Sequence, residues 1–329
     1  MDSQNRSWHS RAAEKRESIL NSIPGRWIIT GMIPSVQEQP DVTRPFIRHF
    51  LSSLEIEITE TDAVGIVAKT SIGDWSAVEV TEAFCHRASV AHQLVWIYAE
   101  ETLFRNTKCL HEAFFDAALS DAKLLDDHLA TFETPLGPLH VLPVSLKDQF
   151  HIKSVDTTMG YVGWINTFQG NKDDARKGTL ESELVRELRA LGAILYCKTS
   201  VPHTLMSGET SNNIIGYTYN PKNRNLTAGG SSGGEGALIG LKGSPGGFGS
   251  EIGGSIRILA AFNGLYRLRP SAGRIPYEGT ANSMDRQCSL LSVLGPLATT
   301  ARSVRLLFGS VLSQEPWLHD PLIVELPWR

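Results

Sequence analysis

Three segments of the chain carry the residue types that nucleophilic catalysis needs. Lys147 ends the segment Pro-Val-Ser-Leu-Lys, Ser231 lies in a Gly-Gly-Ser-Ser-Gly-Gly run, and Ser255 lies in Gly-Gly-Ser-Ile-Arg. A serine hydroxyl becomes a good nucleophile only when a neighbouring base takes its proton. Lysine can act as that base only when it is neutral, which requires a pKa lowered by burial or by nearby positive charge. If the three segments meet in the fold, they could perform acyl transfer without histidine or metal.

Both serine segments belong to a stretch, residues 229–274, that is unusually rich in glycine. Glycine permits positive φ and close approach of a backbone to a ligand, which is typical of loops that surround a reacting group with N–H donors. Phosphate-binding loops use glycine in the same way, so glycine content alone leaves acyl transfer and phosphate or nucleotide binding open. The P-loop, the dinucleotide-binding pattern and the G-x-S-x-G elbow are all absent from the sequence.

The order of the three segments, with 24 positions between the two serines, resembles the amidase signature family. The resemblance extends from residue 137 to residue 329, and the chain is most similar to fungal general amidases of the acetamidase type. Fatty-acid amide hydrolases are more distant relatives. The resemblance implies a hydrolase that cuts the C–N bond of a carboxamide to give a carboxylic acid and ammonia or an amine. It therefore favours acyl transfer over phosphate binding.

The resemblance also implies a role for individual residues. Ser255 is similar to the nucleophile that forms the acyl-enzyme, Ser231 to the serine that relays a proton and follows a cis peptide bond, and Lys147 to the base. Neither a cofactor nor a metal ion is expected. The substrate is expected to contact an acyl pocket and the backbone N–H groups of an oxyanion hole, formed together by Leu205, Ser207, Ser231, Ile252, Gly253, Gly254 and Ser255.

Two departures from the family bear on activity. Glu251 stands where the family usually has aspartate, so an extra methylene must fit beside the oxyanion loop. Family members also continue beyond the position of Arg329, so we expect the C-terminal part of the fold to be missing. An unpaired strand edge, exposed apolar surface and weak hydrolysis should follow. An inactive truncated protein or pseudoenzyme is therefore the alternative to an active amidase.

Periodic apolar residues predict the elements that position these segments. The first 130 residues read as mostly helical, with Ser76 and Glu79 forming a capping box at the start of one helix. Leucines at 180, 184, 188 and 191 predict a helix that ends at Gly192 and leads into a buried strand at 193–197. A second strand at 141–146 ends at Lys147, and a further strand-like run spans residues 322–326.

These elements indicate an α/β fold. We expect a mixed β-sheet core flanked by helices, with an N-terminal helical region at 1–130 and the incomplete amidase signature core at 131–329.

Composition excludes several other functions. The net charge of −4 comes without a basic stripe, which makes nucleic acid a poor candidate partner. No apolar run approaches the length of a membrane span, so we expect a soluble, cytoplasmic protein. The ten histidines show no metal-binding pattern, and the four cysteines lie too far apart for a zinc or redox motif and are expected to be reduced, buried thiols. The partners considered are a small-molecule amide substrate and, as a homo-oligomer, a second copy of the chain.

Overall fold

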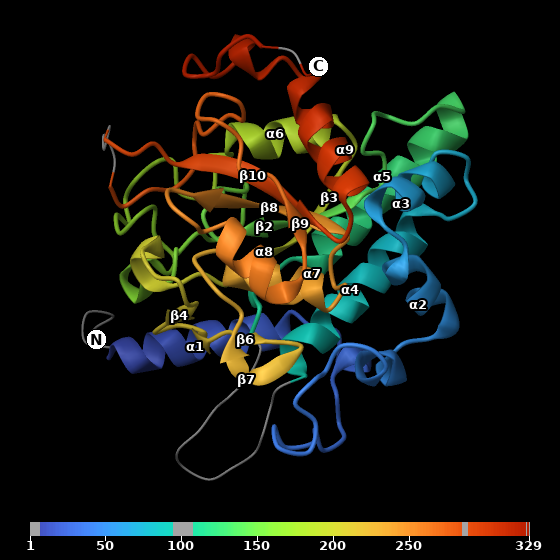
Figure 1. Cartoon of the computed structure of the whole chain (residues 1–329). Helices are drawn as coiled ribbons and strands as arrows, with labels where there is room; N and C mark the ends of the chain where they lie inside the picture. The colour runs from blue at the N-terminus through green and yellow to red at the C-terminus, as the bar shows by residue number, and fades with distance from the viewer. Residues whose placement is uncertain (1–6, 95–107, 285–288, 327, 329) are drawn as a thin grey trace.

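The computed structural model describes residues 7–94, 108–284, 289–326 and 328. A mixed sheet of six strands forms its centre, with the strand order β1-β3-β2-β8-β10-β9 (Figure 1). Strand β2 runs parallel to β3 and to β8, whereas the pairs β1/β3, β8/β10 and β9/β10 are antiparallel. The strands are β1 (Leu110–Ala113), β2 (Pro143–Lys147), β3 (Ile194–Thr199), β8 (Gly246–Glu251), β9 (Tyr266–Arg267) and β10 (Val293–Ala298).

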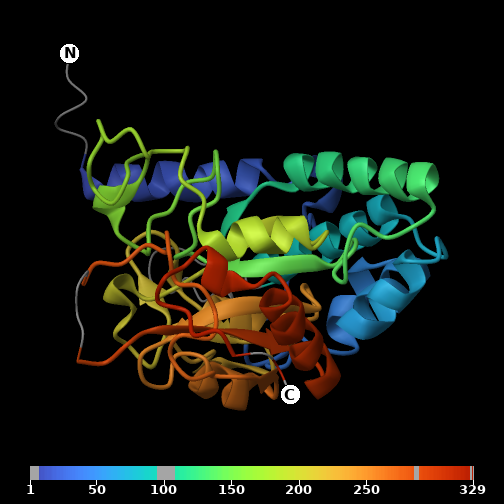
Figure 2. The same cartoon turned by 90° about the horizontal axis from the view of Figure 1, so that it is seen from above.

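Helices cover both faces of this sheet. Figure 1 shows α6 and α9 on one face and α4, α7 and α8 on the other, and Figure 2 shows α1 and α5 along one side of the molecule. The described α-helices are α1 (Trp8–Asn21), α2 (Ser53–Glu60), α3 (Ala63–Thr70), α4 (Ala77–Gln93), α5 (Phe115–Phe132), α6 (Glu183–Ala190), α7 (Gly233–Gly240), α8 (Arg257–Asn263) and α9 (Ala301–Leu312).

Shorter elements connect these layers. Two hairpins are formed by β4 (Ser211–Asn212) with β5 (Gly216–Tyr217) and by β6 (Tyr219–Asn220) with β7 (Asn223–Thr227). Short 3₁₀ helices occur at Gly25–Trp27, Phe46–Phe50, Val162–Trp164, His203–Leu205 and Pro316–Leu318.

The predicted mixed α/β fold is confirmed, and most of the predicted elements are found. Ser76 and Glu79 form the capping box of α4. Leu184 and Leu188 of the leucine repeat lie on α6, Leu191 caps its C-terminus and Leu180 precedes it. Gly192, at a φ of +85°, leads from that helix toward β3. The predicted strand at 141–146 appears as β2. The prediction of a strand at 322–326 is wrong. These residues form a turn and irregular backbone, because they pair with no described strand and make one backbone hydrogen bond to Gly273, from the N–H of Val324.

The main hydrophobic core draws on residues from both ends of the described chain, from Ile23 to Leu312. The described part of residues 1–130 is mostly helical, but it also supplies the edge strand β1 and much of this core. Several apolar side chains in the C-terminal stretch are exposed, namely Leu290, Leu291, Leu318, Leu322, Val324 and Leu326. Their effect on solubility stays a prediction.

Cys85, Cys109 and Cys197 are buried free thiols, and Cys288 lies outside the described residues. Within the described ranges, histidine, cysteine, aspartate and glutamate nowhere gather into a group able to hold a metal ion. None of the helices seen in those ranges has the length and apolar character needed to cross a membrane.

The carboxyl group of Glu187 on α6 is a source of pH-dependent instability. Its side chain is completely buried, and among the described residues neither carboxyl oxygen has a hydrogen-bond partner. Burial, together with the charges of Glu183 and Asp320, raises the pKa of Glu187 to about 8. In the unfolded chain the group ionises near pH 4.5. The folded state therefore loses stability relative to the unfolded state as the pH rises from about 4.5 to about 8.

We expect Glu187→Gln to stabilise the fold at pH 8 and to have a much smaller effect at pH 4.5, because glutamine cannot ionise. Melting temperatures of the two proteins across this pH range measure the difference. Glu17→Gln, which changes an exposed glutamate on α1, is the matched control. A gain for Glu187→Gln that is equal at both pH values would contradict the buried-charge explanation.

Candidate active site

Lys147, the last residue of β2, lies in the interior with a completely buried side chain. Its Nζ lies 2.8 Å from Ser231 Oγ, 2.8 Å from Ser250 Oγ and 3.3 Å from the carbonyl oxygen of Ser250. Ser250 in turn donates from its hydroxyl to Gln149 Oε1 at 2.5 Å. The amine is thus held by hydroxyl and carbonyl oxygens, and its described contacts include no carboxylate.

Burial without a carboxylate contact changes the protonation of this amine. It lowers the pKa of Lys147 to about 7, and the negative charges of Glu235 and Glu251 oppose that shift. Near neutral pH a large fraction of Lys147 is therefore neutral and can accept a proton from the adjacent Ser231 hydroxyl.

Hydrogen bonds join the two serine segments to each other. The peptide bond between Gly230 and Ser231 is cis. Ser232 donates from its hydroxyl to the carbonyl oxygen of Ser255 at 2.7 Å. Thr210 accepts from the N–H of Gly233 and donates to the carbonyl oxygen of Gly229. The segment that carries Ser231 is therefore fixed against the one that carries Ser255.

Ser231 and Ser255 line one small cavity with a volume of about 30 Å³. Ser250, Gln149 and Leu205 contribute to the same lining. Ser255 is half-buried, and no hydrogen bond of its Oγ is found among the described residues. The structure thus brings Lys147, Ser231 and Ser255 into one region: Ser231 contacts the amine, and both serines line the same cavity.

Glu251 organises the loop that carries Ser255. Its carboxylate accepts the N–H groups of Gly254 at 2.6 Å, Ile256 at 2.9 Å and Arg257 at 3.2 Å. The guanidinium of Arg257 also donates to it. These bonds lower the pKa of Glu251 despite its burial, so the carboxylate stays ionised. The side chain of Glu251, one methylene longer than the aspartate expected from the family, fits because it bonds to the loop. Gly254, at a φ of +109°, allows the loop to turn back toward this carboxylate.

Leu205 and Ser207, the two residues predicted for the acyl pocket, occupy different environments. Leu205 lines the small cavity. Ser207 is exposed, its Oγ accepts the N–H of Glu209 at 3.2 Å, and it is absent from the lining. Leu205 therefore borders the cavity of the two serines, whereas Ser207 packs its carbonyl oxygen against Gly230, next to Ser231. The assignment of both residues to an acyl pocket stays a prediction.

Sequence reasoning missed three residues of this arrangement: Gln149, Glu235 and Ser250. Glu235 is fully buried on α7, and its carboxylate accepts the hydroxyls of Ser145 and Thr199, both at 2.7 Å. Burial raises the pKa of Glu235 to about 7. A usable signal existed for Ser250 and Gln149, since each lies within five positions of a residue predicted to be catalytic, Ser255 or Lys147. The partners of Glu235 come from two different strands, so local sequence could not indicate them.

Many glycines of the stretch 229–274 serve close packing. A Cβ at Gly234 would lie 2.2 Å from the backbone nitrogen of Ser200, and one at Gly247 would lie 2.2 Å from Glu235 Oε2. These positions are filled by protein atoms, so they cannot cradle a phosphate group. Residues 252–255 fit the predicted loop around a ligand better, because the space beside Gly253 is open: a Cβ there would meet no atom within 4 Å.

Known proteins similar to this chain are amidases. The family model described as Amidase matches residues 79–326 of the chain. Curated relatives include acetamidases of Emericella nidulans, 46% identical over 98% of this chain and 55% of the relative, and of Aspergillus oryzae, 45% identical over 98% and 55%. The solved structure of a fatty acid amide hydrolase superposes with a TM-score of 0.87 at 33% identity, covering 98% of this chain and 54% of that one. The chain thus spans about half the length of the curated relatives it matches.

The negative charge of Glu235 should tune the titration of Lys147. Ionised Glu235 favours the protonated amine, so Glu235→Gln should move the pKa of Lys147 below about 7. The titration can be followed by NMR of the lysine side-chain carbons in labelled protein, with a Lys147→Met spectrum to assign the signal. Glu209→Gln, at an exposed position, should leave the midpoint unchanged. A midpoint that stays the same or rises in Glu235→Gln would refute this coupling.

Proposed function

Because this chain belongs to the amidase family, we propose that it hydrolyses a carboxamide to a carboxylic acid and ammonia or an amine, with Ser255 as nucleophile. The observation that carries the proposal is the contact between buried Lys147 and Ser231 beside the cavity that Ser255 also lines. A neutral amine, a bridging hydroxyl and a second hydroxyl open to a cavity are the parts that serine acylation requires.

The proposed first step forms the acyl-enzyme. Ser255 Oγ attacks the amide carbon and gives its proton to Ser231 Oγ, whose own proton passes to Lys147 Nζ. The tetrahedral intermediate then breaks its C–N bond. The proton on Lys147 returns through Ser231 to the leaving nitrogen, which departs as ammonia or an amine. Water, activated by the same two residues, attacks the ester and releases the acid.

Ser250 and Gln149 support this relay by orienting the amine. A neutral amine has two hydrogens and one lone pair. If the hydrogens point to the hydroxyl and carbonyl oxygens of Ser250, the lone pair faces Ser231 Oγ. Gln149 fixes the Ser250 hydroxyl, and its own side-chain nitrogen is held by Tyr277 at 2.9 Å.

The oxyanion of the intermediate is proposed to meet backbone N–H groups of residues 252–255. The N–H of Gly254 already donates to Glu251, so Ile252, Gly253 and Ser255 are the donors proposed to act in this structure. One well-placed donor of this kind contributes about 3 kcal/mol of transition-state stabilisation.

The substrate class proposed is a small aliphatic carboxamide such as acetamide or propionamide. The cavity beside the two serines holds only about 30 Å³, a volume that suits a short acyl group better than a long chain. The curated acetamidases support the same choice, since their names point to acetamide.

A larger cavity of about 670 Å³ shares Ile252 and Tyr277 with the small one and could receive the leaving group. Cytoplasmic localisation and self-association stay predictions.

We expect Ser255→Ala to abolish amide hydrolysis and to remove labelling by a fluorophosphonate probe, because no other hydroxyl is proposed to form the acyl intermediate. Ser231→Ala should keep a residual rate, reduced about a hundredfold, since water can replace the relay with poorer alignment. Mass spectrometry of the acyl adduct detects labelling even where turnover is slow. Labelling that persists in Ser255→Ala would sink the assignment, and an unlabelled native chain would favour the inactive-protein alternative.

The rate of hydrolysis should rise with pH through about 7, because the base acts only when Lys147 has lost its proton. Lys147→Ala should lose this limb and reduce the rate by on the order of 10²-fold to 10⁴-fold. Lys147→Arg should be as poor, since the guanidinium stays protonated. The profile of kcat/KM against pH measures both effects. Near-native activity of Lys147→Arg would mean that a different group is the base.

A further inference from the structure

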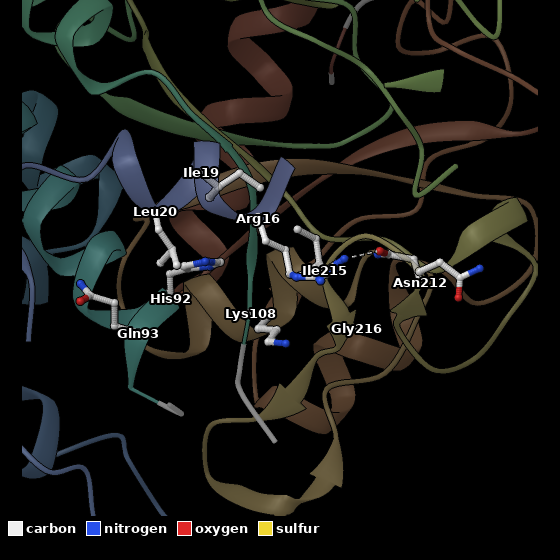
Figure 3. Close-up of a pocket in the computed structure, with 10 residues that line it drawn as sticks. Arg16, Ile19, Leu20, His92, Gln93, Lys108, Asn212, Ile215 and Gly216 are labelled. Carbon is white, nitrogen blue, oxygen red and sulfur yellow. Dashed lines mark hydrogen bonds between the residues drawn. The ribbon is translucent and has the colours of Figure 1, made fainter. Parts of the chain in front are cut away.

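A cavity with a volume of about 160 Å³ lies where helices α7 and α8 end. The same two helices begin just after Ser231 and Ser255, so the cavity lies at their opposite ends and shares no lining residue with the cavity of the two serines. It is also distinct from the cavity between α1, the end of α4 and the hairpin of β4 and β5 (Figure 3). There the guanidinium of Arg16 donates to the carbonyl oxygen of Ile214, whereas the cavity at α7 and α8 contains cations without such a bond.

Arg44 and Lys222 are the cations of this lining that have no partner among the described residues. Arg44 precedes the 3₁₀ helix at Phe46–Phe50, and Lys222 lies in the turn between β6 and β7. A Cβ at Gly264 would lie 2.6 Å from Lys222 Nζ, so this ammonium lies directly beside the end of α8. Two charges from distant parts of the chain thus converge on one space.

Arg87 and Lys242 also line the cavity, and they share a single carboxylate. Glu60 lies 3.7 Å from a nitrogen of each of them and also accepts a hydrogen bond from Arg48. Burial lowers the pKa of Lys242, and the charges of Arg87, Arg44 and Arg48 lower it further against the opposing effect of Glu60. These cations therefore lie close enough to repel one another.

Negative charge near the cavity offsets only part of this positive charge. The described lining contains no aspartate or glutamate. The ends of α7 and α8 each contribute about half a negative charge. Just outside the lining, Asp41 accepts the hydroxyl of Thr43. When Arg48 is counted with the cations of the lining, five cations face Glu60, Asp41 and the two helix ends, which leaves an excess of about two positive charges.

Asn263 supplies a hydrogen-bond acceptor to the same cavity. Its Nδ2 donates to the carbonyl oxygens of Ala228 at 2.8 Å and Leu259 at 2.7 Å, which fixes the orientation of the amide. Its Oδ1 is buried and has no hydrogen-bond partner among the described residues. A Cβ at Gly240, which also lines the cavity, would lie 3.6 Å from this oxygen. A ligand that carries a proton as well as negative charge would satisfy the oxygen.

The other residues of the lining add a hydroxyl and an apolar wall. Thr299 is half-buried, and no hydrogen bond of its hydroxyl is found within the described ranges, so it can bond to a ligand. Thr43 already donates to Asp41. The rest of the wall offers no charged or polar side chain and consists of Ile239, Gly240, Leu241, Gly264 and Leu265.

We propose that this cavity binds inorganic phosphate as the hydrogen phosphate dianion, with its oxygens at Arg44, Lys222 and Lys242 and its proton donated to Asn263 Oδ1. Guanidinium and ammonium groups form strong, charge-assisted hydrogen bonds with phosphate oxygens. Sulfate has a similar shape and charge but no proton to donate, and the dianion of a phosphate monoester also lacks one. Side chains hold the ion, without a glycine-rich loop, and the site is independent of the proposed hydrolysis.

Isothermal titration calorimetry of the full chain at pH 8 tests the choice of ligand, with sodium phosphate, sodium sulfate and methyl phosphate compared at equal ionic strength. Phosphate should bind about tenfold or more tightly than the other two anions, because only phosphate satisfies the buried oxygen of Asn263. Binding of sulfate or methyl phosphate as tight as that of phosphate would overturn the assignment.

Variants of the cavity test its place in the fold. Arg44→Gln and Lys222→Gln, both at exposed positions, should each weaken phosphate binding about tenfold, as expected for loss of a charge-assisted hydrogen bond. Thr299→Glu places a carboxylate among the cations and should abolish binding. Arg305→Gln, at an exposed arginine of α9 outside the lining, is the matched control and should bind as the native chain does.

Melting curves establish which variants are folded, and phosphate should raise the melting temperature of the native chain more than sodium chloride of equal ionic strength does. The proposal would be overturned by a native chain that does not bind phosphate. Unchanged affinity in folded Arg44→Gln and Lys222→Gln proteins would overturn it as well.

Discussion

The candidate active site depends on one constraint, the burial of a lysine amine with no carboxylate against it. An ammonium ion loses hydration when it enters the protein interior, and hydroxyl and carbonyl oxygens replace only part of that loss. Lys147 consequently gives up its proton near neutral pH. Glu235 and Glu251 lie near enough to influence the amine but are bonded elsewhere. Glu235 accepts two hydroxyls, and Glu251 accepts N–H groups of the loop that carries Ser255. Their placement moderates the effect of burial without cancelling it.

The sheet creates this environment. Strands β2, β3, β8 and β10 are buried along their whole length, so a polar side chain on any of them must find its partners inside the protein. Ser145 and Lys147 alternate with apolar residues on β2. Ser145 contacts α7 through Glu235, and Lys147 contacts Ser231 just before α7 begins. The glycines of β8 leave room for this polar layer, which would otherwise be filled by side chains.

How far the sequence could predict this arrangement differs from residue to residue. The strand ending at Lys147, the capping box at Ser76 and the helix before β3 follow from local pattern and were predicted correctly. The run at 322–326 has the composition of a strand, but strand formation needs a partner, which local composition does not reveal. Gln149, Glu235 and Ser250 escaped notice for a related reason. Their roles arise from contacts between segments that lie far apart in the sequence. Gln149 and Ser250 could have been considered because they are close in sequence to Lys147 and Ser255, whereas no local signal pointed to Glu235.

The pairing of β2 with β8 has an implication for how the sequence can change. Ser145 pairs with Gly247 and Leu146 with Phe248, which places Lys147 beside Ser250 at the end of β8, just before the loop that carries Ser255. Side chains alternate between the two faces of a strand, so insertion or deletion of one residue within β2 would turn the lysine toward the opposite face. The loop that follows β8 is constrained in another way, because its N–H groups at Gly254 and Ile256 bond to Glu251 and it carries Ser255. One residue inserted in β2, even a small and apolar one, should therefore disrupt the candidate site.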